Sequence, residues 1–303
     1  MNSLKGIFYG IVTSVTFGLI PLFTLPLMQK GMEFDSILFY RFLFATLALG
    51  GMMKLKKESF RIERRDIPML ILLGFFYTGS AMFLFWGYNF MGAGVATTLH
   101  FTYPIFVTLL MFLIFRERAS WVTWLAIILA IFGVSRLSLK GTELDPVGVV
   151  IVLLSAVAYA SYITAVNRSR VRDMNGRKLA FYVFIVSTVL FAIKAGTNQG
   201  IQALPDAWSI VNLFLLAVVP TVISNITLVL AVHHIGGTLT SILGAMEPVT
   251  AVCIGVLVFS EPFTAQEGTG ILCIIAAVTL IILTRTIQKT LSSVVRKIRP
   301  RHA

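Results

Sequence analysis

Residues 95–118 read VATTLHFTYPIFVTLLMFLIFRER, in which 21 residues without Asp, Glu, Lys or Arg precede the triplet Arg116-Glu117-Arg118. At a rise of about 1.5 Å per residue, a helix of this length crosses the ~30 Å hydrocarbon core of a bilayer. Similar apolar runs recur along the chain. This stretch therefore predicts a membrane-spanning helix, and its recurrence predicts a bundle of such helices.

The composition supports the same fold class. Hydrophobic residues make up 57% of the 303 residues and charged residues only 13%, which is about half the charged share of an ordinary globular domain. We predict an all-α integral membrane protein with ten transmembrane helices, bounded by charges, Pro, Gly and Asn. The expected ranges are 4–28, 36–53, 67–90, 95–115, 120–137, 147–166, 179–194, 209–233, 238–259 and 266–284.

The basic residues predict an orientation. With the N-terminus in the cytoplasm, 20 of the 25 Lys and Arg residues fall in cytoplasmic segments and four in outer ones, while Arg41 lies within a helix. Because Lys and Arg stay on the cytoplasmic side, we expect a multi-pass protein of the inner (plasma) membrane with both termini in the cytoplasm. The tail 289–303 is interpreted as a solvated end near lipid headgroups, with a lipid-binding or partner-binding segment as the alternative.

An internal repeat appears when the second half is shifted by 144 residues. Residues 239–262 read LTSILGAMEPVTAVCIGVLVFSEP, so that Pro248 falls on Pro104 and Glu261 on Glu117. Three further identities follow from the same shift: Ser80 with Ser224, Gly92 with Gly236, and Phe115 with Phe259. We therefore expect a first five-helix repeat at 1–140 and a second at 145–288.

Charge also predicts that the two repeats are inverted. Five helices are an odd number, so equivalent loops must lie on opposite sides of the membrane. The loop Arg116-Glu117-Arg118 is basic, whereas its counterpart Ser260-Glu261-Pro262 carries no arginine. Inverted halves that meet near the bilayer centre are a recurring architecture of secondary transporters.

Several motifs resemble a known family. Glu247-Pro248-Val249 followed by Phe259-Ser260-Glu261-Pro262 is similar to the second-repeat signature of the drug/metabolite transporter (DMT) superfamily, and of its EamA family in particular. Tyr103-Pro104-Ile105 and Phe115-Arg116-Glu117 resemble the weaker first-repeat form. Tyr40-Arg41-Phe42 resembles the start of the family's second helix.

The resemblance covers essentially the whole chain. It implies a ten-helix inner-membrane permease, usually an exporter of amino acids or other metabolites. One departure is visible, because the Gly that often precedes the motif Glu is Arg116 in one half and Ser260 in the other.

Polar residues at mid-depth are the candidates for the substrate site, because a polar group in hydrocarbon needs a partner or a water-lined surface. Glu247 is the most informative of them, and Tyr103 is its repeat equivalent. Glu247 is interpreted as a ligand for a substrate amine or as a proton carrier, with a structural hydrogen bond to another helix as the alternative. Pro104 and Pro248 are the expected hinges or helix breaks.

Further candidates lie within about a turn of the midplane. As substrate-binding residues we add Tyr159, Tyr162, Ser80, Ser224, Asn225 and Ser14, together with His100 nearer the outer leaflet. Packing between helices is the alternative for each of them. Arg41 is expected to extend toward the membrane surface, and the stripe Gly6, Gly10, Ser14 and Gly18 is expected to pack closely against another helix.

The function expected from these features is a secondary exporter that works by alternating access at the interface of the repeats. Its substrate would be a small neutral or zwitterionic metabolite, such as an aromatic or apolar amino acid. A proton or a counter-substrate is the candidate driving force, since no GxxxxGK[ST] loop occurs. An uncoupled facilitator, a membrane-embedded enzyme and a membrane sensor are the alternatives.

The partners follow from the same features. Besides the small-molecule substrate we expect membrane lipids, no nucleic acid, no cofactor and no metal. The protein would be a monomer or a homodimer.

Overall fold

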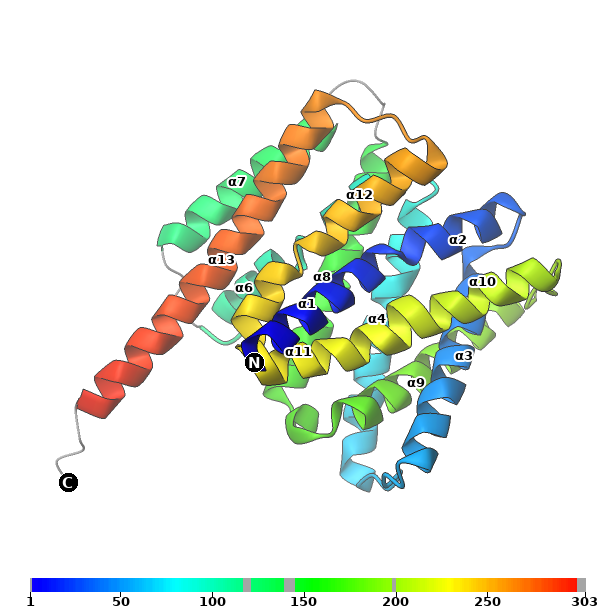
Figure 1. Ribbon diagram of the computed structural model, residues 1–303, viewed down its shortest axis with the longest axis horizontal. Helices are drawn as coiled ribbons and strands as arrows, with labels where there is room; N and C mark the ends of the chain where they lie inside the picture. Colours follow the sequence, from blue (N-terminus) through cyan, green and yellow to red (C-terminus); the bar gives the residue numbers. More distant parts are fainter. Residues whose placement is uncertain (1, 117–120, 139–144, 198–199, 299–303) are drawn as a thin grey trace.

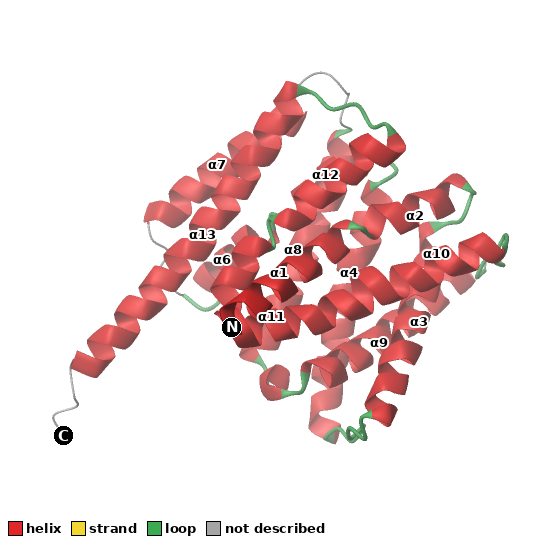
Figure 2. Ribbon diagram, viewed as in Figure 1, coloured by secondary structure: helices red, strands yellow, loops and turns green. Residues whose placement is uncertain are grey.

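The computed structural model describes residues 2–116, 121–138, 145–197 and 200–298, and every regular element in these ranges is helical (Figure 2). The helices are α1 (Asn2–Gly18), α2 (Ile20–Gln29), α3 (Phe34–Leu55), α4 (Ile67–Gly87), α5 (Ala93–His100), α6 (Tyr103–Leu113), α7 (Trp121–Ser138), α8 (Pro146–Arg168), α9 (Gly176–Thr197), α10 (Ala207–Ala217), α11 (Ser224–Leu243), α12 (Met246–Phe259) and α13 (Ala265–Ile298). Short 3-10 turns are η1 (Arg64–Asp66) and η2 (Arg170–Asp173), and η3 (Val218–Ile223) is a π-helix. Glu117, Arg118 and the end of the tail, which figure in the sequence predictions, lie outside the described residues.

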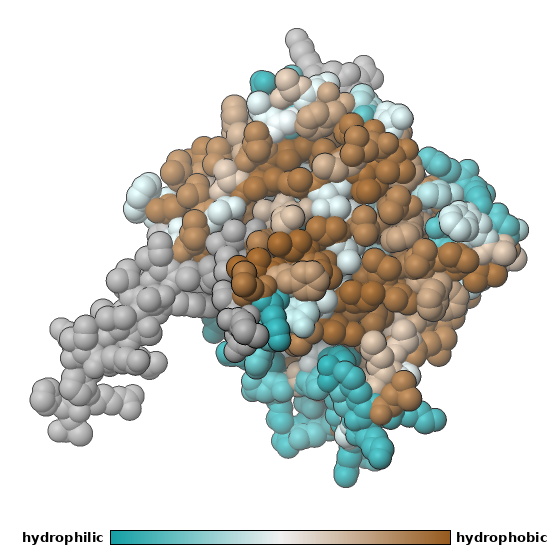
Figure 3. All heavy atoms as spheres, in the orientation of Figure 1, coloured by the Kyte–Doolittle hydropathy of each residue, from teal (hydrophilic) through white to brown (hydrophobic). Residues whose placement is uncertain are grey.

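The helices are long and apolar enough to form a membrane bundle. Within the described ranges, eight helical stretches meet the length and hydropathy of a membrane span, and Trp121–Val134 and Met246–Phe259 are shorter apolar helices. Together they make the ten expected transmembrane segments. Hydrophobic side chains form a broad band across the surface, and hydrophilic ones gather at its edges (Figure 3). Lipid explains why Phe75, Ile128 and other large apolar side chains are exposed.

Two of the predicted spans are interrupted near their middles by the expected prolines. The span 95–115 divides into α5 and α6, with Pro104 in the first turn of α6. Near Gly244 the helical backbone breaks again, and Pro248 lies in the first turn of α12. Because proline has no N–H to donate, it fits best in a first turn, where that N–H would have no helical partner, and it removes a hydrogen bond in a helix interior.

The predicted end of one helix at residue 233 and start of the next at residue 238 are wrong. The helical backbone of α11 continues from Ser224 to Leu243 through Gly236 and Gly237. Glycine lowers helix propensity but keeps its N–H, so the helical hydrogen bonds are retained there. A glycine pair is thus a weaker stop signal than the prolines.

The two halves pack as reciprocal partners, which is the arrangement that a two-fold axis produces. The first helix of each half packs on the third helix of the other, α1 on α11 and α8 on α4. Two pairs join equivalent helices, α3 with α9 and α7 with α13, the latter pair lying at one side of the bundle (Figure 1).

Loop contacts show that the repeats are inverted. We call the face that carries residues 54–66 and 168–178 the basic face. There Arg177 donates from Nε to Glu58 Oε1 at 3.0 Å. On the opposite face, the backbone N–H of Glu33 donates to Gln202 Oε1 at 2.6 Å. With the shift of 144 residues, Glu33 is equivalent to Arg177 and Glu58 to Gln202. The same pair of positions is therefore in contact once on each face.

Ion pairs strengthen these loop contacts. The hydrogen bond from Arg177 lowers the pKa of Glu58. On the opposite face Lys30 lies 2.6 Å from Asp206, and Lys194 pairs with Asp35. Lys30, with the N–H of Ser209, lowers the pKa of Asp206 to about 2. These contacts join the two halves around α3 and α9.

The small-residue stripe of α1 packs closely against α11 and α12, as the sequence predicts. A Cβ added to Gly6 would lie 2.3 Å from Ile235 Cγ2, and one added to Gly10 would lie 2.5 Å from Leu243 Cδ1. A Cβ at Gly18 would lie 2.6 Å from the backbone oxygen of Glu247. The stripe thus sets the distance between α1 and the helix that carries Glu247.

The turns after α6 and α12 have the backbone conformation of glycine at the two positions where the sequence has Arg116 and Ser260. Ser260 has φ +54° and Arg116 has φ +53°, a backbone region that favours glycine. Both halves therefore retain the glycine-like turn without the glycine. Glu261 then accepts a hydrogen bond from the N–H of Ala93 at 2.9 Å, which links the second half to the start of α5 in the first half.

Candidate functional site

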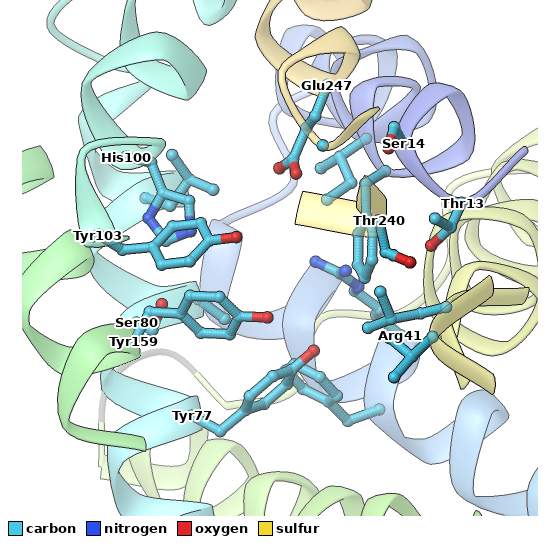
Figure 4. A pocket seen from close by; sticks show the side chains of 18 residues that line it. Thr13, Ser14, Arg41, Tyr77, Ser80, His100, Tyr103, Tyr159, Thr240 and Glu247 are labelled. Atoms are coloured by element: carbon cyan, nitrogen blue, oxygen red, sulfur yellow. The ribbon is translucent and has the colours of Figure 1, made fainter. Parts of the chain in front are cut away.

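A central cavity of about 180 Å³ lies between the two repeats (Figure 4). Helices α1, α2, α3, α4, α5 and α6 of the first half line it, together with α8, α11 and α12 of the second. Its polar lining residues are Thr13, Ser14, Arg41, Tyr77, Ser80, His100, Tyr103, Tyr159, Thr240 and Glu247. The cavity is smaller than the roughly 300–1,000 Å³ pockets of drug-sized ligands, so it favours a small solute.

Glu247 supplies the carboxylate of this cavity. It is the second residue of α12, directly before Pro248, so the helix break places its side chain in the interior of the bundle. Figure 4 shows the carboxylate directed into the cavity. Within the described residues, its oxygens have no hydrogen-bond or ion-pair partner. A carboxylate in such a place is costly unless a proton or a cationic group meets it.

Arg41 supplies a cation to the same cavity, and the expectation that it reaches the membrane surface is wrong. Its side chain is buried, with 4% of its surface exposed. Nε donates to Thr221 Oγ1 at 2.9 Å, and the guanidinium lies over the rings of Phe42 and Phe85. These inward contacts hold the guanidinium in the bundle, where Figure 4 shows it facing the cavity.

The two charges remain separate. No ion pair joins Arg41 to Glu247, and in the described part of the chain the terminal nitrogens of Arg41 have no hydrogen-bond partner. The cavity thus presents one anionic and one cationic group, each with unfilled bonding capacity. A solute that carries both charges would satisfy both groups.

Three tyrosines form an aromatic wall beside these charges. The rings of Tyr103 and Tyr159 meet edge to face, with centroids 4.7 Å apart, and Tyr77 lies 6.3 Å from Tyr159. Figure 4 shows their hydroxyls directed toward the cavity centre. This wall offers apolar ring surface together with hydroxyl groups that donate or accept hydrogen bonds.

His100 takes part in a buried hydrogen-bond chain. Ser155 Oγ donates to the backbone oxygen of Ser80 at 2.8 Å and lies 2.8 Å from His100 Nδ1. Since the hydroxyl has one proton and gives it to Ser80, Nδ1 must be the donor of the second bond. In the neutral ring Nε2 is then an acceptor. His100 is therefore positioned by α4 and α8 as well as lining the cavity.

The structure brings six of the nine candidate residues into the cavity lining: Glu247, Tyr103, Tyr159, Ser80, Ser14 and His100. Contact of any of them with substrate stays a prediction. The other three do not line this cavity, and their contact with substrate also stays a prediction. Ser224 bonds back to Pro220 O at 2.6 Å, because a helical serine readily reaches the preceding turn. Asn225 and Tyr162 line a second cavity instead.

This second cavity has a volume of about 450 Å³ and reaches the basic face at Asn175 and Arg177. Leu228 lines both cavities, so they adjoin. The repeat-equivalent residues differ in exposure at this point. Val229 is 52% exposed, whereas its counterpart Phe85 is fully buried. The second cavity therefore extends from the central cavity toward the basic face.

Four further polar residues line the cavity and are not among the sequence candidates for the substrate site: Arg41, Tyr77, Thr13 and Thr240. For Arg41 the signal was present, because a charge within a span is by default a functional candidate. The two threonines and Tyr77 carry no such signal, because similar residues occur throughout the spans.

Comparison with known proteins settles the family. Residues 4–139 and residues 146–283 each match the model of the EamA-like transporter family. The chain belongs to this family of transporters. The two matches correspond to two EamA-like repeats, and the family accounts for the motifs around Glu247 and Glu261.

Relatives of this EamA-like protein are named as transporters. Uncharacterized transporter sll1319 of Synechocystis sp. is 27% identical over 216 residues, covering 69% of this chain and 64% of that protein. The chain thus spans less than two thirds of that relative. Uncharacterized transporter PM1281 of Pasteurella multocida is 26% identical over 294 residues, covering 91% of this chain and 95% of that protein.

A solved crystal structure shares the fold of this EamA-like protein. The TM-score is 0.65 at 16% identity, over 94% of this chain and 98% of the other. At this identity the likeness shows the fold alone.

Proposed function

We propose that this membrane transporter carries a small zwitterionic solute, such as an aromatic or apolar amino acid, out of the cell. The observation that carries the proposal is the pair Arg41 and Glu247, which face one cavity without pairing with each other. The solute's carboxylate would meet the guanidinium of Arg41, and its ammonium group would meet Glu247. Each charge would then gain the partner that it lacks.

The rest of the cavity supports the same solute class. An anion without an amine would leave Glu247 unpaired, and an amine without a carboxylate would leave Arg41 unpaired. Leaving a buried charge unpaired costs about 2–5 kcal/mol. The tyrosine wall would contact the solute's apolar side chain. A membrane-embedded enzyme is less well supported, because one carboxylate without a paired acid or a metal cluster in the described residues does not form a hydrolytic site.

Transport would proceed by alternating access of the two repeats. In this proposal the second cavity, which extends from the central one toward the basic face, belongs to the state that is open on that side. We propose that the protein lies in the inner membrane, with the basic face and both chain ends on the cytoplasmic side. The solute would then enter from the cytoplasm, as export requires.

Flux into and out of liposomes that contain the purified protein tests this proposal. We expect labelled phenylalanine to be carried faster than phenylalaninamide, which lacks the carboxylate charge, and faster than 3-phenylpropionate, which lacks the amine. Leucine and alanine, tested in the same assay, define the side-chain preference. Empty liposomes are the control.

The result that contradicts the proposal is equal flux of the amino acids and the single-charge analogues, or no flux of any amino acid. Repeating the assay with an imposed pH gradient separates a proton-coupled exporter from an uncoupled facilitator. Flux that ignores the gradient removes proton coupling and leaves the two-charge site intact.

A further inference from the structure

We infer that Thr221 is a positioning residue, which orients the Arg41 guanidinium so that its terminal nitrogens face the solute. The inference rests on the proposed function, because it assigns how one of the two charges of that site is held. Thr221 does not line the cavity. It acts through Arg41.

The backbone around Thr221 departs from the α-helix. Residues Val218–Ile223 form a π-helix between α10 and α11, and Pro220 lies within it. Pro220 has no N–H, so the carbonyl of Leu216, four residues earlier, loses its α-helical donor. Thr221 Oγ1 donates to that carbonyl at 3.0 Å. Such π-helical turns are frequent at functional sites.

This bond fixes the role of the Thr221 hydroxyl. Its single proton points at Leu216, so toward Arg41 the oxygen presents only lone pairs. Arg41 Nε donates to that oxygen at 2.9 Å. The bond is fully buried, as Thr221 has no exposed surface. An acceptor of fixed direction therefore anchors the inner nitrogen of the guanidinium.

The rings of Phe42 and Phe85 complete the anchor. Arg41 Cζ lies 5.5 Å from the centroid of Phe42 and 5.6 Å from that of Phe85, and both rings are fully buried. With Nε and the faces of the cation occupied, the terminal nitrogens remain for an anionic group. A planar pair of donors held in this way suits a carboxylate, which accepts two parallel bonds.

Thr221→Val, which keeps the shape and removes the hydroxyl, tests this role. We expect the KM for phenylalanine to rise about tenfold, the size of effect that follows from losing a hydrogen bond to a charged group. The KM for phenylalaninamide and the maximal rate should change little, because neither depends on the carboxylate contact. Thr221→Ser should restore the wild-type KM.

Thr78→Val is the matched control. Thr78 is also buried and donates to Ser187 Oγ at 2.9 Å, but it is not hydrogen-bonded to Arg41 and does not line the cavity. Its removal should leave the ratio of the two KM values unchanged. Equal loss of phenylalanine and phenylalaninamide transport in Thr221→Val, or no change in either, would overturn the inference.

Arg41→Lys separates this inference from the proposed function. If Arg41→Lys leaves the discrimination between phenylalanine and its amide intact, then the carboxylate does not bind at Arg41 and the proposed function fails. If Arg41→Lys reduces the discrimination and Thr221→Val does not, then only the role of Thr221 fails.

Discussion

Glu247→Gln is expected to reduce phenylalanine transport by about 30- to 1,000-fold in kcat/KM, because the ammonium group of the solute loses its counter-charge. This range corresponds to about 2–4 kcal/mol, which lies within the cost of about 2–5 kcal/mol for leaving one member of a buried charge pair alone. Glutamine preserves the shape of the side chain, so α12 should pack as before. The measurement is initial flux in liposomes, with protein folding checked by thermal unfolding.

Transport of 3-phenylpropionate distinguishes charge recognition from a general loss of function. That solute has no amine, so Glu247→Gln should leave its slow flux unchanged or raise it by removing repulsion. Asp206→Asn is the matched control, because it removes one carboxylate charge from the surface pair with Lys30. Should both variants lower all fluxes alike, Glu247 would have a structural role, which is the alternative that the sequence left open.

Gly18→Leu should have the second large effect, through packing. A Cβ at this position would already lie 2.5 Å from Thr250 Cβ and 2.6 Å from the backbone oxygen of Glu247. The backbone oxygen of Glu247 cannot rotate away as a flexible side chain would, so α1 and α12 must separate. We expect destabilisation of at least about 1–3 kcal/mol, the common range for overpacking, and loss of transport because Glu247 moves with α12. A lowered unfolding temperature and absent flux are the measurements.

Gly51→Leu provides the comparison for Gly18→Leu. Gly51 is exposed within α3, and a Cβ there meets no atom within 4 Å. The same substitution should therefore be tolerated, and in a helix interior leucine is favoured over glycine. Unchanged stability and flux in Gly18→Leu would show that α1 and α12 are not held at the distance described.

Much of this fold follows from the sequence, because hydrocarbon imposes simple rules on length and polarity. The spans, the stripe of α1 and the interruptions near Pro104 and Pro248 all depend on local chemistry. The end of α11 does not follow from local chemistry, since Gly236 and Gly237 disfavour a helix without preventing it from continuing. The repeat could be seen because proline and glutamate recur at an equal spacing, although apolar helices resemble one another by composition.

The site was harder to predict, because depth in the membrane does not specify direction. Ser80 and Ser224 are repeat equivalents at similar depth, yet only Ser80 lines the cavity. Asn225 lies one residue beyond Ser224 and borders the second cavity. A single long basic side chain within a span predicts extension toward the membrane surface, whereas Thr221 and Phe85 hold that of Arg41 inward. Such tertiary contacts have no signature in a single helix.

The central claim is that one solute site between two inverted repeats opens to each face in turn. Leu84 and Leu228 are repeat equivalents that both line the cavity, on the sides of the opposite and basic faces. The two native cysteines are first removed by Cys253→Ala and Cys273→Ala. In this background Leu84 and Leu228 are each replaced by Cys, one at a time. Membrane-impermeant thiol reagents are then applied from either face, with and without phenylalanine.

We predict that Leu228→Cys reacts from the basic face in the absence of solute and that Leu84→Cys is protected. Phenylalanine should make Leu84→Cys reactive from the opposite face and reduce the reactivity of Leu228→Cys. If transport proceeds while Leu84→Cys stays protected, or if both positions react fully from both faces at once, the two-state account is contradicted.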